Sequence, residues 1–263
     1  MFSNAEAYER FMGRWSRLVA PKLVKFSDSP AGSHILDVGS GTGSLAFAVA
    51  DGDAKARVEG IDPSKEYVAY ATQRNRFPDR VRFQVGDAQE LSLPEAQFDA
   101  ALSLLVFNFI PNEAKALQQV RRVTRPGGRI AAAVWDYSEG MKMLRTFWEA
   151  AAVVDPDSEK LTEKAMKLCH RGELTALWQQ AGLVDVREEP IDITTRFRSF
   201  PDYWDAFLLG QGTAGAYAVR LNPEMQAALR SEVKKRLAVA SETTPFDLPA
   251  RVWAVRGDVP KGG

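Results

Sequence analysis

Cysteine is nearly absent from this chain of 263 residues, which contains Cys169 and no second cysteine. An internal disulfide framework and a metal site built from several cysteines are therefore both excluded. Histidine is almost as rare, since only His34 and His170 occur. Few side chains could therefore act as a base with an ordinary pKa near neutrality.

Long apolar runs and an excess of charge of either sign are also missing. No uncharged stretch approaches the roughly twenty residues that a membrane span needs, and the first residues lack the basic and apolar segments of a signal peptide. Lysine plus arginine and aspartate plus glutamate both number 34, whereas a nucleic-acid binder usually carries a basic excess. We therefore expect a cytoplasmic protein with no membrane span and no nucleic-acid partner.

Apolar strand-like segments alternate with helical segments through much of the chain. The first five strand-like segments are 35–38, 58–62, 81–85, 98–105 and 129–135. Strands separated by helices are typical of βαβ units and a parallel sheet. With two further strands at 184–195 and 251–256, the pattern predicts an α/β fold: a Rossmann-like, seven-stranded, mostly parallel sheet with helices on both faces.

Proline, asparagine and glycine mark the expected boundaries of these elements. Pro63 suits the first position of the helix after the second strand, and Asn112 precedes the helix after the fourth. Residues 126–128, Pro-Gly-Gly, predict a turn immediately before the fifth strand.

The remaining segments are predicted to be helical additions to one domain, 1–263. Segment 4–25 has apolar residues at the spacing of an amphipathic helix: Tyr8, Phe11, Met12, Trp15, Leu18 and Val19. Segments 137–170 and 199–245 are rich in aromatic residues and have no obvious strand, so we interpret them as cap insertions. The core of the domain is then about 30–136, 172–198 and 246–257.

A glycine-rich loop, Asp37-Val38-Gly39-Ser40-Gly41-Thr42-Gly43, follows the first strand. A phosphate-binding P-loop is excluded, because no lysine follows the last glycine. A dinucleotide fingerprint fits imperfectly, because its third glycine would fall on Ser44. What remains is Asp-x-Gly-x-Gly-x-Gly, in which glycines allow a ligand to approach the backbone closely at the end of a strand.

This pattern resembles the first signature motif of class I S-adenosylmethionine-dependent methyltransferases. Asp62 and Asp87 follow Asp37 at equal intervals, and each ends one of the next two strands. Segments 98–109 and 125–129 also match the family's fourth strand and the turn before its fifth. The resemblance covers roughly residues 30–136.

The resemblance implies that S-adenosylmethionine is the cofactor. Asp62 would accept hydrogen bonds from the ribose hydroxyls, since a carboxylate is an acceptor with room for two donors; capping a helix is its competing role. Asp87 would bind the adenine amino group beside the Ala88 amide, although it could also be a turn residue. The implied cofactor contacts are Tyr8, Gly39, Ser40, Gly41, Asp62, Pro63, Asp87, Ala88, Ser103, Leu104 and Phe109. Tyr8 would close over the cofactor, and Trp15 is a second candidate for which core packing is the simpler role.

A catalytic side chain is not required, because methyl transfer depends mainly on alignment of the reactants. Asp136, after the fifth strand, and His170, at the end of the first cap segment, are the candidates for a substrate-side carboxylate or base. Asp136 could instead cap a helix, and His170 could be a surface residue. His34 is predicted to be structural. Aromatic residues that would suit a hydrophobic or aromatic acceptor are Tyr137, Trp148, Tyr203, Trp204 and Phe207.

The resemblance thus implies a methyltransferase that acts on oxygen, nitrogen or carbon of a small-molecule acceptor, without a metal. Two other functions stay open. The protein could bind the cofactor without transferring methyl, as a cyclase-like enzyme would, or it could be an NAD(P)-dependent oxidoreductase. The acceptor and the oligomeric state are not encoded in any motif of the sequence.

Overall fold

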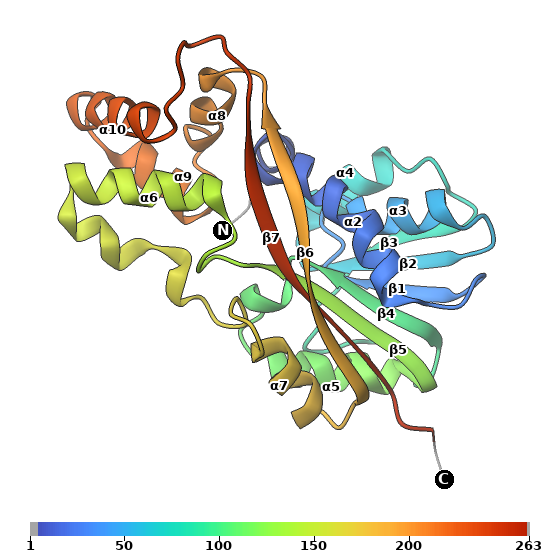
Figure 1. Cartoon of the computed structure of the whole chain (residues 1–263). Helices are drawn as coiled ribbons and strands as arrows, with labels where there is room; N and C mark the ends of the chain where they lie inside the picture. The colour runs from blue at the N-terminus through green and yellow to red at the C-terminus, as the bar shows by residue number, and fades with distance from the viewer. Residues whose placement is uncertain (1–4, 262–263) are drawn as a thin grey trace.

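Seven strands form one sheet in the order β3-β2-β1-β4-β5-β7-β6 (Figure 1). The computed structural model describes residues 5–261. The strands are β1 His34–Val38, β2 Arg57–Asp62, β3 Val81–Val85, β4 Phe98–Leu104, β5 Thr124–Trp135, β6 Val184–Phe197 and β7 Phe246–Asp258. Strands β1 to β5 are parallel, and β7 runs antiparallel between β5 and β6. The predicted seven-stranded, mostly parallel sheet is confirmed.

The strand order reverses between β1 and β4, at the centre of the sheet. From β1 the chain moves outward through β2 to β3, then returns to place β4 on the other side of β1. The loops that follow β1 and β4 therefore diverge and leave a crevice at the carboxyl ends of these strands. The central strands are buried on both faces, which explains their continuous apolar sequence.

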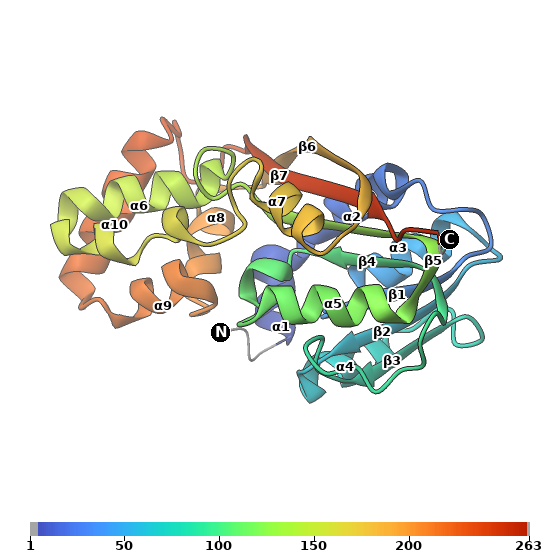
Figure 2. The same ribbon diagram turned by 90° about the horizontal axis from the view of Figure 1, so that it is seen from below.

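Helices cover both faces of the sheet and extend beyond one end of it. The helical elements are α1 Ala5–Tyr8, η1 Glu9–Gly13, α2 Arg14–Ser27, α3 Ser44–Gly52, α4 Lys65–Gln73, η2 Phe107–Phe109, α5 Glu113–Val123, α6 Lys142–Val154, η3 Pro156–Leu161, η4 Glu163–Ala165, α7 Glu173–Gln180, α8 Phe200–Phe207, α9 Gly212–Arg220 and α10 Pro223–Arg236. Helices α2 and α3 pack in one hydrophobic core and α5 and α7 in another. Figures 1 and 2 show α6, α8, α9 and α10 gathered beyond one end of the sheet. None of the helices within residues 5–261 is long and apolar enough to cross a membrane.

The predicted N-terminal helix is interrupted by the π-helical turn η1, and residue 4 lies outside the described residues. Phe11 packs edge-on against Phe207, with ring centroids 5.5 Å apart, and so joins this helix to the cap. The buried stripe of α2 follows Trp15 and Val19, while Leu18 lies beside that stripe and is 42% exposed. The spacing therefore predicted the helix but not the environment of Leu18.

Several predicted boundaries are corrected by local hydrogen bonding. Pro63 does not begin a helix, because the Ser64 hydroxyl accepts a hydrogen bond from the Tyr67 amide and caps α4 one residue later. The predicted turn at 126–128 is an irregularity within β5, where pairing with β4 shifts register. Strand β7 begins five residues earlier than predicted, at Phe246, because it pairs with β6 beyond the rest of the sheet.

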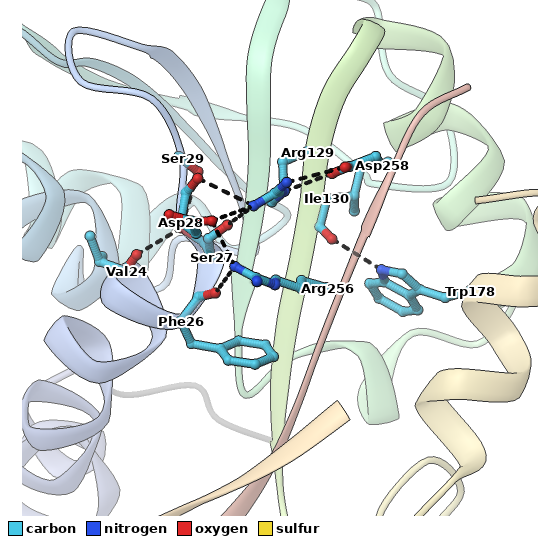
Figure 3. A network of polar contacts seen from close by, with 10 residues as sticks. All are labelled: Val24, Phe26, Ser27, Asp28, Ser29, Arg129, Ile130, Trp178, Arg256 and Asp258. Atoms are coloured by element: carbon cyan, nitrogen blue, oxygen red, sulfur yellow. Dashed lines mark hydrogen bonds and ion pairs between the residues drawn. The ribbon is translucent and has the colours of Figure 1, made fainter. Parts of the chain in front are cut away.

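Two arginines tie the end of α2 to the sheet (Figure 3). Arg129 donates from Nε and Nη2 to the Asp258 carboxylate at 2.6 and 3.1 Å, and from Nη1 to the Ser27 carbonyl at 3.0 Å. Arg256 donates to the Phe26 carbonyl at 2.9 Å and pairs with Asp28 at 3.2 Å. These cations meet the carbonyl groups at the carboxyl end of a helix, where positive charge is favourable. The network therefore fixes the N-terminal helix to β5 and β7.

Replacing Arg129 with methionine tests the contribution of this network, because the apolar stem is retained and the guanidinium is lost. We expect the free energy of unfolding in urea to fall by about 2–3 kcal/mol, since hydrogen bonds to charged groups contribute roughly 1.5–3 kcal/mol. Arg125→Met is the matched control: Arg125 pairs with Asp99 on the surface, and its side chain is 52% exposed. Its loss should cost less than about 1 kcal/mol; equal losses in the two variants would contradict the assignment.

Candidate functional site

A cavity of about 580 Å³ opens at the carboxyl ends of β1, β2 and β4, in the crevice where the strand order reverses. Ten of the predicted cofactor contacts line it: Tyr8, Gly39, Ser40, Gly41, Asp62, Pro63, Asp87, Ala88, Leu104 and Phe109. They belong to five separate segments of the chain, which the sheet topology brings together. Ser103 is absent from the lining because its hydroxyl donates to the Val38 carbonyl at 2.8 Å, inside the sheet.

The glycine loop packs so tightly that two of its three glycines have no room for a side chain. Gly39 and Gly43 have positive φ angles of 72° and 90°. A Cβ atom at Gly39 would lie 2.5 Å from Val106, and one at Gly43 would lie 2.7 Å from Phe47. Gly41 also has positive φ, at 50°, but a Cβ there would meet nothing within 4 Å. Its backbone therefore faces open space, as a surface that receives a ligand must.

Asp62 is held by the backbone of two loops. Its Oδ2 accepts a hydrogen bond from the Gly41 amide and its Oδ1 accepts one from the Ser64 amide, both at 2.9 Å. The residue is 8% exposed, and burial raises the pKa of its carboxyl. Ser64, rather than Asp62, caps α4. Because each carboxylate oxygen can accept more than one hydrogen bond, Asp62 keeps acceptor capacity toward the cavity.

Asp37 also lines the cavity, although the resemblance did not place it among the cofactor contacts. Its Oδ2 accepts a hydrogen bond from the Ala46 amide at 3.1 Å, while its buried Oδ1 has no hydrogen-bond partner among the described residues. Burial, with a smaller contribution from the charge of Asp62, raises the pKa of Asp37 to about 7. The signal was present in the sequence, since Asp37 is the first residue of the glycine motif.

The ends of β3 and β4 complete the wall of the cavity. Asp87 accepts a hydrogen bond from the Gln89 amide at 2.8 Å and also lines the cavity, so it is a turn residue that faces the site. Leu105 has a φ of 64°, in the left-handed region that non-glycine residues rarely adopt, and lines the same wall. Backbone strain of this kind concentrates at functional sites.

The N-terminal segment covers the cavity from above the glycine loop. Tyr8, Met12 and Ser16 line it, and the Tyr8 and Ser16 hydroxyls are hydrogen-bonded at 3.0 Å. Burial raises the pKa of Tyr8 to about 12, so its hydroxyl stays protonated. In the π-helical turn, Glu9 accepts a hydrogen bond from the Thr42 hydroxyl at 2.5 Å. This bond fastens the covering segment directly to the glycine loop.

The residues proposed from the sequence as acid–base candidates do not line the cavity. Asp136 is buried in a turn, where its Oδ1 accepts hydrogen bonds from the Ser138 hydroxyl and the Glu139 amide. It caps this turn rather than a helix, since α6 begins later. His170 is partly exposed and lies 3.4 Å from Glu173. Local partners thus account for both residues without a ligand.

Most of the aromatic residues suggested for acceptor binding form the core of the cap instead. Phe207 stacks on Phe147 with centroids 4.4 Å apart, and the Tyr203 hydroxyl donates to the Met143 carbonyl. Trp15 likewise packs against Phe197, 5.2 Å away, as its core role predicted. Among the suggested aromatics, Tyr137 lines the cavity. Trp148, Tyr203, Trp204 and Phe207 are buried away from it. His34 lies beside Glu59 at the start of β1.

The charge of the cavity is of one sign. Asp37, Asp62 and Asp87 line it, and no lysine, arginine or histidine does so among residues 5–261. Within the same residues no group of three or more His, Cys, Asp or Glu side chains could hold a metal ion. The buried Oδ1 of Asp37 without a partner and the open space at Gly41 suit a ligand that carries positive charge and hydroxyl donors.

Comparison with known proteins agrees with this geometry. A family model described as "Methyltransferase domain" matches residues 36–132. Demethylmenaquinone methyltransferase of Bacillus licheniformis is 28% identical over 181 residues, which cover 64% of this chain and 78% of that protein. The 27-O-demethylrifamycin SV methyltransferase of Amycolatopsis mediterranei is 38% identical over 104 residues, so the alignment spans only 38% of the length of either protein.

A similar fold occurs in the phosphoethanolamine N-methyltransferase 2 of Haemonchus contortus. The TM-score is 0.59 at 19% identity, over 98% of this chain and 57% of that one. That enzyme has been solved with S-adenosylhomocysteine and with S-adenosylmethionine. The fold of this chain is therefore similar to that of a protein that binds S-adenosylmethionine. Residues 36–132 thus match a methyltransferase domain, and the whole chain has the fold of proteins solved as methyltransferases.

Proposed function

We propose that this protein transfers the methyl group of S-adenosylmethionine to a small-molecule acceptor by direct in-line displacement. The observation that carries the proposal is the cavity itself, in which three carboxylates at the ends of successive strands surround open backbone and no cation intervenes. The small acceptor is supported by two relatives, a demethylmenaquinone methyltransferase and a 27-O-demethylrifamycin SV methyltransferase.

Each polar residue of the cavity has a part of the cofactor that it suits. Asp62, held by two backbone amides, is placed to accept hydrogen bonds from the ribose hydroxyls. Asp87 and the Ala88 amide would bind the adenine edge. The free Oδ1 of Asp37 would accept a hydrogen bond from the ammonium of the aminoacyl part, and Gly41 would lie against its backbone.

The reaction requires mainly that the cofactor and the acceptor are aligned and that water is excluded. When bound, S-adenosylmethionine supplies an electrophilic methyl group on a sulfonium. Tyr8 and Met12 cover the cavity from one side and Tyr137 lines it toward the cap, so these residues keep water away and orient the acceptor. Positioning of this kind can contribute roughly 7–11 kcal/mol to lowering a barrier, and no side chain needs to exchange a proton for that gain.

The same charge distribution argues against a dinucleotide cofactor. NAD(P) would bring phosphate groups next to Asp37 and Asp62, with no cationic side chain in the lining to offset the repulsion. The glycine loop also has Ser44 where a dinucleotide fingerprint has its third glycine. An oxidoreductase function is therefore disfavoured by two independent features of the site.

Calorimetric titration tests the proposed function. We expect saturable binding of S-adenosylmethionine and S-adenosylhomocysteine, no binding of NADPH, and release of S-adenosylhomocysteine when the enzyme is supplied with a panel of quinol, phenol and amine acceptors. Binding of NADPH without binding of S-adenosylmethionine would overturn the proposal.

Removal of the Asp62 carboxylate tests its assignment to the ribose. We expect Asp62→Ala to weaken binding of S-adenosylhomocysteine by roughly a hundredfold, because two hydrogen bonds to a charged group are lost at about 1.5 kcal/mol or more each. Asp53→Ala is the control, since Asp53 also accepts loop amides, from Gly32 and Lys55, but does not line the cavity. Unchanged affinity in folded Asp62→Ala would contradict the assignment.

The raised pKa of Asp37 predicts a specific pH dependence of stability without cofactor. In the folded protein its pKa is about 7, above the ordinary value of 3.8 that holds in the unfolded chain. Between these values the folded state binds more protons, so stability falls as pH rises, with a slope of up to about 1.4 kcal/mol per pH unit. We expect Asp37→Asn, which keeps an acceptor for the Ala46 amide, to remove this fall.

The measurement is the free energy of unfolding of both proteins in urea at about pH 5 and about pH 8. Other groups titrate alike in the two proteins, so their contributions cancel in the difference. If wild type and Asp37→Asn lose the same stability between these conditions, Asp37 does not titrate as its burial implies.

A further inference from the structure

A small second cavity, here called the extension, shares part of its wall with the cofactor cavity. It has a volume of about 20 Å³ and shares Met12, Phe109 and Tyr137 with the main cavity. A space that holds one water molecule needs roughly 10–15 Å³. The extension therefore fits a single group of the size of a water molecule, such as an amino group, next to the place where the acceptor must lie.

Glu163 is the one carboxylate that lines this extension. The residue is 8% exposed, and its carboxylate accepts a hydrogen bond from the Trp148 indole. The Ala214 amide and the Thr213 side chain also donate to it. Both belong to the first turn of α9, and a helix N-terminus favours negative charge. Burial raises the pKa of Glu163, whereas these donors lower it by stabilising the ionised form.

The described part of the chain provides no cation to neutralise this carboxylate. Across residues 5–261, no lysine, arginine or histidine lies within ion-pair distance of Glu163. Asp202, by contrast, is a half-buried carboxylate that pairs with Arg14 at 2.9 Å. A buried charge without a partner is costly, and proteins normally pair it or place it at a ligand site. The donors around Glu163 offset part of this cost although burial still raises its pKa, and the cavity leaves room for a ligand beside it.

We propose that the extension receives an ammonium group of the methyl acceptor, and that Glu163 selects acceptors that carry one. This inference rests on the proposed function, because the extension adjoins the cofactor cavity. An ammonium would supply the missing positive charge, and the Phe11, Phe109 and Tyr137 rings that line the extension are compatible with an organic cation. A hydroxyl of the same size would leave the charge of Glu163 uncompensated. Glu163 acts here in recognition, and its role does not require transfer of a proton.

The competing role for Glu163 is that of a structural cap for α9. Loss of a helix cap lowers stability. It should not change the relative binding affinities of a charged and a neutral ligand of the same shape. Discrimination between such ligands is therefore the readout that separates recognition from a structural role.

The test uses 2-phenylethylamine and the neutral 2-phenylethanol as probes, because they share a ring and chain length and differ in charge at neutral pH. Each is titrated into the full-length protein by calorimetry or ligand-observed NMR, with and without S-adenosylhomocysteine. Wild type should bind the amine roughly ten- to a hundredfold more tightly than the alcohol. Glu163→Gln should lose this preference, and Glu163→Asp should keep part of it.

Glu159→Gln is the matched control, because Glu159 is an exposed residue of the same cap segment, outside both cavities. It should behave as wild type does. No binding of the amine by wild type, equal binding of amine and alcohol, or an unchanged preference in folded Glu163→Gln would each overturn the inference. If Glu163→Gln does not fold, the inference is tested by the preference of wild type for the amine and by the reduced preference expected of Glu163→Asp.

The arm with S-adenosylhomocysteine separates this inference from the proposed function. Binding of S-adenosylhomocysteine without selective binding of the amine removes the inference and leaves the methyltransferase proposal intact. If the protein binds the amine selectively and through Glu163 but binds no S-adenosylhomocysteine, the methyltransferase proposal fails and the amine site remains.

Discussion

Close packing of the loop after β1 is the constraint on which the site depends. Side chains at Gly39 and Gly43 would collide with Val106 and Phe47, and a Cβ at Gly60 in β2 would lie 2.8 Å from Ser40. The loop is therefore held against both neighbouring strands and also against the covering segment, through Thr42 and Glu9. Because backbone rather than side chains faces the cavity at Gly41, the wall that a cofactor meets is rigid before the cofactor arrives.

Much of the cavity lining could be predicted because its determinants are local. Asp62 and Asp87 stand at strand ends, and parallel strands bring their carboxyl ends to one edge whatever the rest of the chain does. The glycine pattern needs only a strand before it and a helix after it. Pro63 was misjudged because its role depends on a single competing hydrogen bond, from the Tyr67 amide to the Ser64 hydroxyl.

The second cavity could not be predicted, because its residues meet only through the packing of distant segments. Glu163 begins the short 3₁₀ segment η4 and gains its partners from α6 and α9. The helical spacing of the aromatic residues is equally compatible with a core position and with a pocket position for Trp148 and Phe207. The structure places both residues in the hydrophobic core of the cap. Asp136 follows the expected strand, but its carboxylate accepts hydrogen bonds from the Ser138 hydroxyl and the Glu139 amide and does not line the cavity. No pattern in the neighbouring sequence encodes such outcomes.

The acidic lining of the cavity bears on how a turnover ends. The ligand that enters carries a sulfonium, and the ligand that leaves is a thioether with one positive charge fewer. Asp37, Asp62 and Asp87 attract the first more than the second, since Coulomb attraction scales with the charge of the ligand. Carboxylates that favour binding of S-adenosylmethionine therefore weaken inhibition by S-adenosylhomocysteine. Added salt screens the attraction and would reduce both effects together.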